Sequence, residues 1–178
     1  MAQHWSRVEM DKATNNLIRQ IPLPEKVFEI SGSKWKKFGF KNYQNSFYPE
    51  FDICEQVLLE KVDLIIAEQV WEHLRFPYKA TKNVIESLNP KGKFLITVPF
   101  LVRYHPTPID CYRWSASGLK YFLHECGFEL LKIKVGSWGN KDCLLSNLDN
   151  WIDFQGQSLE NDPKFPIHCW ALASKGNF

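Results

Sequence analysis

The chain lacks most of the features that would assign it to a specialised class of protein. Its 5 cysteines in 178 residues are an odd number, and no two of them form a C-x-x-C pair. Scattered cysteines exclude a disulfide framework and indicate reduced thiols, so the sequence predicts no metal site. No apolar run reaches the roughly 18 residues of a membrane-spanning helix. The N-terminus lacks the basic and apolar regions of a signal peptide, so we expect a soluble cytoplasmic protein.

An excess of charge of one sign is missing as well. The 22 Lys and Arg residues nearly balance the 20 Asp and Glu residues, for a net charge of +2. This balance argues against a dedicated nucleic-acid surface, and the lysines of segment 34–41 are interpreted as a solvated loop, with a local basic patch as the alternative. Apolar and charged contents of 44% and 24% are those of an ordinary globular protein of one domain, residues 1–178.

The most informative segment is Asp63 to Phe100. Its parts follow in the order apolar run, polar elbow, helix, turn and second apolar run, at residues 64–67, 68–73, 77–88, 89–92 and 93–99. This order predicts a strand, a helix and a second, parallel strand. Because ligands of open α/β sheets bind at the carboxyl ends of the strands, we expect the chemistry at the elbow and directly after Pro99.

The rest of the chain continues the alternation of helices and strands. Ser6 and Glu9 fit a capping box at the start of a helix. The expected helices are 7–19, 115–126 and 144–154, and the expected extended segments are 26–30, 42–51, 128–135 and 168–173. The pattern predicts a single doubly wound α/β domain with a mostly parallel, Rossmann-like sheet and helices on both faces. Residues 1–24 would form an N-terminal helical segment, and 136–166 an insertion before the last strand.

Two short motifs carry a resemblance to a known family. Val70-Trp71-Glu72-His73 resembles the V-L-E-H-like elbow, and Asn89-Pro90-Lys91-Gly92 the N/K-P-G-G-like turn, of class I S-adenosylmethionine-dependent methyltransferases. The chain is similar to their small bacterial type 11-like branch. The resemblance implies S-adenosylmethionine as cofactor and methyl transfer to a small-molecule or sugar-type acceptor by in-line displacement. The family has two strands between its first motif and the strand that begins here near Asp63, and we expect one of them to be shortened or absent.

The resemblance also implies a set of cofactor-binding residues. Glu29 and the turn Ser31-Gly32-Ser33 stand where the family has an acidic residue and a glycine-rich turn, and small residues there let a bulky cofactor approach the backbone. Asp52 would hold the ribose hydroxyls, and Glu68 with Gln69 the methionine part. The alternatives are an ordinary strand-to-loop turn at Gly32 and a plain surface carboxylate at Asp52.

A loop after Pro99 would bind the acceptor. Family members that resemble this chain have an H-x-x-P-x-D-x-x-R-aromatic pattern there, which corresponds to His105, Pro108, Asp110, Arg113 and Trp114. His105 or Asp110 would accept a proton as catalytic residues, and the residues expected to bind substrate are Arg103, Tyr104, Arg113 and Trp138. In the alternative interpretation an Asp110–Arg113 salt bridge pins the loop. Glu72 and His73 are expected to brace it by hydrogen bonds.

Two rival functions differ in class. A methyltransferase-like fold without activity, acting as a binding or regulatory partner, is favoured by the single glycine of the Ser31–Ser33 turn and by the short Asp52 region. A nicotinamide-dependent enzyme would require G-x-G-x-x-G after the first strand, and the sequence lacks it.

Overall fold

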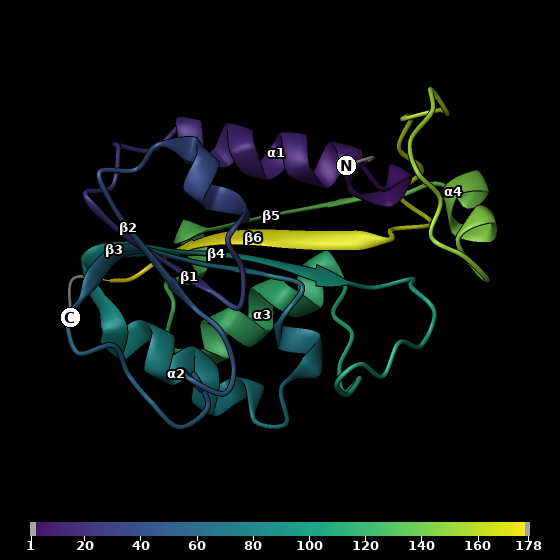
Figure 1. Cartoon of the computed structure of the whole chain (residues 1–178). Helices are drawn as coiled ribbons and strands as arrows, with labels where there is room; N and C mark the ends of the chain where they lie inside the picture. Colours follow the sequence, from purple (N-terminus) through teal and green to yellow (C-terminus); the bar gives the residue numbers. More distant parts are fainter. Residues whose placement is uncertain (1–2, 177–178) are drawn as a thin grey trace.

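A six-stranded sheet forms the centre of the molecule (Figure 1). The computed structural model describes residues 3–176. The sheet order is β2-β1-β3-β4-β6-β5, and β6 alone runs antiparallel to its neighbours. The strands are β1 (Lys26–Ile30), β2 (Asn42–Ser46), β3 (Val62–Glu68), β4 (Leu88–Pro99), β5 (Ile133–Trp138) and β6 (His168–Ser174). The predicted α/β class with a mostly parallel sheet is confirmed.

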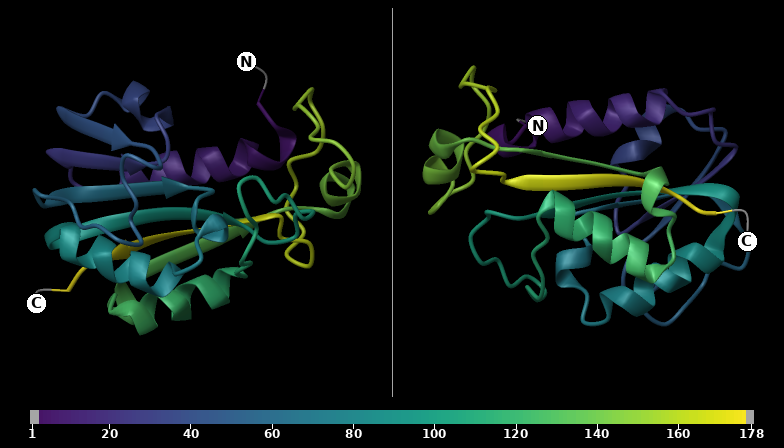
Figure 2. Two further views of the ribbon diagram at one scale, coloured as in Figure 1. Left: turned by 60° about the horizontal axis from the view of Figure 1, so that its bottom comes forward. Right: turned by 180° about the vertical axis from the view of Figure 1, so that it is seen from behind.

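Helices cover both faces of this sheet, as predicted (Figures 1 and 2). Helix α1 (Val8–Arg19) and the 3-10 turn η2 (Lys34–Phe38) lie on one face, and α2 (Pro77–Ser87) and α3 (Ala116–Cys126) lie on the other. Short helical pieces complete the fold: η1 (Trp5–Arg7), η3 (Trp71–His73), η4 (Leu130–Lys132) and α4 (Lys141–Ser146). None of the helices in residues 3–176 combines the length and the apolar character needed to cross a bilayer.

The sequence explains why β3 and β4 form the middle of the sheet. Leu64, Ile65 and Ile66 in β3 are fully buried, as are Leu95 and Ile96 in β4. Near-continuous apolar runs are typical of parallel strands with both faces covered, because alternate side chains enter the two opposite cores. The α2 and α3 side forms one core, and α1 with η2 forms the other.

Three local predictions are wrong. The strand expected at 128–135 is β5, which begins at Ile133 because residues 130–132 form η4. Arg7, not Ser6, is the residue before α1, and no side chain caps the helix. Ser6 is instead buried, and its hydroxyl lies 3.2 Å from Nε2 of His168. The hydroxyl that would cap the helix therefore makes a tertiary contact. The helix expected at 144–154 is the short α4, which begins at Lys141 because the Asn140 side chain accepts the backbone N–H of Cys143.

The expected loss of a strand is visible in the topology. Along the chain β2 is the one strand between β1 and β3, and in the sheet it lies at one edge, beside β1. The predicted turn at 89–92 is present as an interruption inside β4: pairing with β3 passes from Leu88 directly to Lys93, and Lys91 has a positive φ of 63°. All five cysteines are free thiols.

Candidate active site

The carboxyl end of β1 is organised by one buried carboxylate. Glu29 is 1% exposed. Its oxygens accept hydrogen bonds from the backbone N–H groups of Lys34 (3.1 Å) and Trp35 (2.9 Å) and from the hydroxyl of Tyr43 (2.6 Å). Burial, and after it the hydrogen bond to Glu29, raises the pKa of Tyr43, so this hydroxyl stays a donor. Glu29 therefore shapes the loop that follows β1.

Gly32 is required by this arrangement. A Cβ on Gly32 would lie 2.2 Å from Oε1 of Glu29, closer than any real contact. Ser31 has a φ of +54°, and its N–H donates to the carbonyl of Ser46 at the end of β2, 2.8 Å away. Asn45 holds the turn from the same strand, through its side-chain amide and the Gly32 carbonyl (2.7 Å). The turn is thus fixed on both sides, with only small side chains at its tip.

Glu68, at the carboxyl end of β3, contacts the same loop. Its side chain accepts from Nζ of Lys34 (2.7 Å) and from the indole N–H of Trp35. Lys34 also pairs with Asp11 of α1, 2.6 Å away. Since a carboxylate offers about four lone-pair positions, Glu68 keeps acceptor capacity beyond these two bonds. Gln69, with a φ of +55°, donates its side-chain amide to Oγ1 of Thr97 (3.0 Å).

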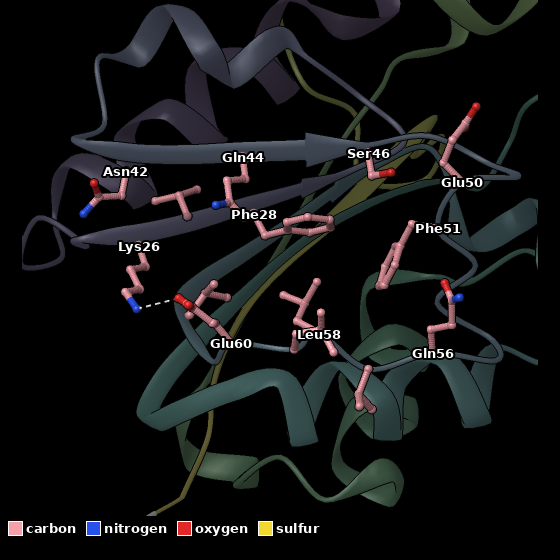
Figure 3. A pocket seen from close by; sticks show the side chains of 14 residues that line it. Lys26, Phe28, Asn42, Gln44, Ser46, Glu50, Phe51, Gln56, Leu58 and Glu60 are labelled. Atoms are coloured by element: carbon pink, nitrogen blue, oxygen red, sulfur yellow. Dashed lines mark hydrogen bonds and ion pairs between the residues drawn. The ribbon is translucent and has the colours of Figure 1, made fainter.

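Asp52, the residue predicted to hold the ribose hydroxyls, has a local structural contact. It stands in the loop after β2, and its side chain accepts the backbone N–H of Cys54 at 2.8 Å, which makes it the cap of a turn. Its neighbour Glu50 lines a groove of about 960 Å³ on the α2 side of β1 and β2. In Figure 3 the rings of Phe28 and Phe51 stand in this groove, with Ser46 and Glu50 toward the carboxyl end of β2.

The elbow after β3 contains a buried acid without a partner. Glu72 is 0% exposed, and neither of its carboxylate oxygens has a hydrogen-bond partner among the described residues. Burial raises its pKa to about 8, although the nearby backbone N–H of Glu72 itself, and after it the positive charges of Arg113 and Arg7, act in the opposite direction. The sequence predicted that Glu72 would brace the following loop by hydrogen bonds. Its backbone does so, because its carbonyl accepts from Cys111 (2.7 Å), whereas its side chain does not.

The loop after β4 is fixed by the salt bridge that the sequence offered as an alternative. Asp110, with a side chain only 3% exposed, forms a two-point pair with Arg113, and the pKa of Asp110 is lowered mainly by this contact. Asp110 also accepts the backbone N–H of His105 (2.9 Å). His73 braces the loop from the elbow, because its Nδ1 contacts the carbonyl of Ile109. Asp110 is therefore a positioning group for the loop.

The four residues predicted to bind substrate differ in their surroundings, although Arg113 and Arg103 are in contact. Arg103 lies 4.3 Å from the ring centre of Trp151 and donates to the carbonyl of Asn147, while Tyr104 is exposed. Arg113 is committed to Asp110. Trp138 is a core residue, 3% exposed, whose indole N–H donates to the carbonyl of Leu159. The prediction for Trp138 is corrected on this ground: it supports the insertion from within and offers no free face.

Loop 100–115 and the segment between β5 and β6 lie side by side at this end of the sheet (Figure 2). Sequence reasoning missed His168 in this region. It begins β6, it is fully buried, and burial followed by the charges of Arg7, His105 and His4 lowers its pKa to about 3. Its Nδ1 has no hydrogen-bond partner among residues 3–176. No local motif marks it, because its neighbours come from η1 and from the loop.

Comparison with known proteins supports the fold. No family model and no curated protein matches the sequence. Among solved structures, phosphoethanolamine N-methyltransferase 2 of Haemonchus contortus, in complex with phosphomonomethylethanolamine and S-adenosylhomocysteine, has a TM-score of 0.61 at 11% identity. The match covers 95% of this chain and 53% of that one, so the chain spans about half the length of the nematode enzyme.

Two further structures are matched over nearly their whole length. An S-adenosylmethionine-dependent methyltransferase of Archaeoglobus fulgidus has a TM-score of 0.57 at 15% identity, with 96% of each chain covered. A chain from the complex between the Haloferax volcanii Trm112 methyltransferase activator and a methyltransferase has a TM-score of 0.59 at 12% identity, with 98% of this chain and 95% of that one covered. Together with the sheet topology, these matches show that the protein has the class I S-adenosylmethionine-dependent methyltransferase fold.

Proposed function

We propose that the protein is a methyltransferase that uses S-adenosylmethionine and methylates a small-molecule or sugar-type acceptor. The observation that carries the proposal is the turn around Glu29, because a buried carboxylate there holds a tight loop of small residues at the carboxyl end of β1. In open α/β sheets this is the place where cofactors bind. The similar solved structures are S-adenosylmethionine-dependent methyltransferases, which supports the same cofactor here.

The residues at this end of the sheet fit such a cofactor in part. The backbone of Ser31–Ser33 and the spare acceptor positions of Glu68 would receive its amino acid part, next to Gln69. For the ribose hydroxyls we favour Glu50 over Asp52, because Glu50 lines the groove at the end of β2 whereas Asp52 caps a turn. The bound cofactor supplies a methyl group already activated on a sulfonium, so the chain has mainly to align and desolvate the acceptor.

The loop after β4 would present the acceptor. The Asp110–Arg113 pair holds the loop in one shape, and His105 is the loop residue whose ring retains a free nitrogen, because its Nδ1 faces the carbonyl of Arg103 at 3.1 Å. That free nitrogen would take the proton of an acceptor hydroxyl or amine. Arg103 and Tyr104, at the mouth of the loop, are the proposed substrate contacts.

Calorimetry with S-adenosylmethionine tests the proposal. We expect the wild-type protein to bind the cofactor and Gly32→Ala to lose binding, because the added Cβ displaces the Glu29 carboxylate. Gly39→Ala is the control: a Cβ there meets no atom within 4 Å, so any cost of that substitution comes from the φ of +80° alone. Thermal unfolding checks that both variants fold.

The opposite result would favour the rival function. A folded wild-type protein that shows no heat of binding would support a methyltransferase-like binding or regulatory partner. The bonds of Lys34 and Trp35 to Glu68 favour that reading, because the chain's own side chains already occupy part of the place expected for the cofactor. Equal cofactor affinity in Gly32→Ala and the wild type would show that the site lies elsewhere.

A further inference from the structure

Three side chains with metal-binding atoms converge at the elbow. One ligand atom each from Glu72, His73 and His105 lies within 4.8 Å of the other two. Glu72 and His73 belong to η3 after β3, and His105 to the loop after β4, so the group joins two segments that are distant in sequence. The separation between Oε1 of Glu72 and Nε2 of His73 is 3.7 Å. Two ligands of one tetrahedral zinc ion lie about 3.4 Å apart, given bonds of roughly 2.1 Å.

Backbone carbonyls orient the two imidazoles for such a role. A carbonyl only accepts, so the contact of His73 Nδ1 with the carbonyl of Ile109 places the ring proton on Nδ1 and leaves the lone pair on Nε2. In His105 the nearest partner of Nδ1 is the carbonyl of Arg103 at 3.1 Å, ahead of a guanidinium nitrogen of Arg113 at 3.4 Å. Histidine ligands of metals are commonly held in this way, with the second ring nitrogen donating to a carbonyl.

The carboxylate supplies the independent observation. Glu72 is fully buried, and both of its oxygens lack a hydrogen-bond partner in the described part of the chain. Burying a polar group without a partner is costly, and burying a charge without one is more so. Three acceptor atoms that face one another can share one positive species, either a proton on the carboxyl group or a metal ion. Neither guanidinium nearby removes the need, because Arg113 is bound to Asp110 and Arg7 makes no hydrogen bond to Glu72.

We propose that Glu72, His73 and His105 bind a divalent transition-metal ion of the zinc type, with the remaining coordination positions open to water or a ligand. Two imidazoles and one carboxylate suit zinc, cobalt or iron, whereas magnesium and calcium prefer oxygen ligands alone. The ion would tie the elbow to the loop after β4. With the ion bound, His105 would be a ligand and no longer a base; in the proposed methyl transfer the ion would lower the pKa of an acceptor group bound to it, and the proton would pass to water.

Metal titration of the chelator-treated protein tests this site without any activity assay. We expect one zinc ion per chain by calorimetry, a visible absorption band when cobalt(II) replaces zinc, and no binding of magnesium. His105→Ala and Glu72→Gln should each weaken zinc binding by at least about 10-fold. Thermal unfolding should show that zinc stabilises the wild type and neither variant.

Two control variants separate this site from adventitious binding. His124→Ala removes an exposed histidine of α3 and should leave the zinc affinity unchanged. Cys111→Ser removes the exposed thiol on the same loop and should also leave it unchanged. Absence of stoichiometric zinc in the wild type would overturn the proposal. So would zinc binding that survives in His105→Ala and is lost in Cys111→Ser. If Glu72→Gln fails to fold, His105→Ala, on the loop surface, still decides the question.

Discussion

The carboxyl end of β1 and the elbow after β3 each bury a glutamate, and the two differ in how that glutamate is satisfied. Glu29 accepts three hydrogen bonds from its own chain. Glu72 accepts none through its side chain, although it is as deeply buried. The first carboxylate holds a loop in shape. The second is left with unused acceptors beside two imidazoles, at an energetic cost that folding alone does not explain.

This difference separates structural groups from candidate functional ones. A buried charge that is fully bonded contributes to the fold, and its neighbours explain it. A buried charge without bonds points outside the chain, to an ion, a ligand or an ordered water. By this criterion the Glu29 turn is a scaffold that offers backbone and small side chains, and the elbow is where an added species would bind most directly.

The largest expected effect on stability comes from disturbing the hydrogen bonds of Glu29. Glu29→Gln replaces one acceptor oxygen by an NH₂ group that faces donors, so we expect a loss of about 3 kcal/mol in the free energy of unfolding. Urea unfolding followed by circular dichroism measures it. Glu25→Gln, an exposed glutamate before the same strand, is the control. A loss below about 1 kcal/mol would mean that the hydrogen bonds of Glu29 are dispensable.

A smaller, local effect is expected at the salt bridge of the loop. Arg113→Lys keeps the charge but loses the two-point contact with Asp110, so the loop should open about 2 kcal/mol more easily. Hydrogen exchange of the His105 amide, which donates to Asp110, reports this opening. Exchange at β3 should not change. The same substitution at the exposed Arg75 should leave the His105 amide unaffected.

Replacing Glu72, the glutamate whose side chain accepts no hydrogen bond, should instead raise the free energy of unfolding. Glu72→Met removes a buried carboxyl group that has no partners, so we expect the metal-free protein to gain about 1 kcal/mol in stability. Urea unfolding in the presence of a chelator measures the change. A loss comparable to that of Glu29→Gln would show that Glu72 is structurally bonded after all, for example through buried water.

The last prediction concerns the pH dependence of stability and not a single loss at neutral pH. The pKa of His168 is lowered from 6.5 to about 3, first by burial and then by Arg7, His105 and His4. A lowered pKa means that the neutral ring contributes stability above pH 6.5, and that this contribution is lost as the pH falls from 6.5 toward 3, because the unfolded chain takes up the proton first. The slope of the unfolding free energy against pH is proportional to the number of protons taken up on unfolding. His168→Gln should lower that number by about one in this pH range. An unchanged slope would contradict the shift.

Local sequence patterns predicted most helices and strands of the molecule well. The apolar runs of β3 and β4, Pro77 at the first turn of α2 and Gly127 after α3 act over a few residues, and the structure has these elements near the expected places. The motif at the elbow predicted a site at the carboxyl end of β3, where Glu68 and Gln69 stand. The capping box failed because Ser6 is used by His168, a residue at the other end of the chain.

The roles of individual site residues were harder to predict from the sequence. Asp52 fits the sequence offset for a ribose ligand, yet it caps a turn, and Trp138 fits a pocket aromatic, yet it is in the core. Glu72 and His73 gave a visible motif. Their proximity to His105 depends on how a proline-rich loop of the next strand folds back over the elbow, and no spacing in the sequence encodes that distance.

The sequence by itself determined the class of fold and the order of its elements, because hydrophobic periodicity and turn residues act locally, and it predicted a site at the carboxyl ends of the strands. Only the tertiary structure decided which carboxylate is bonded and which is left open. Burial and hydrogen-bond partners are properties of the folded environment: the same residue type is a scaffold at Glu29 and an unpaired acid at Glu72 because different segments surround it.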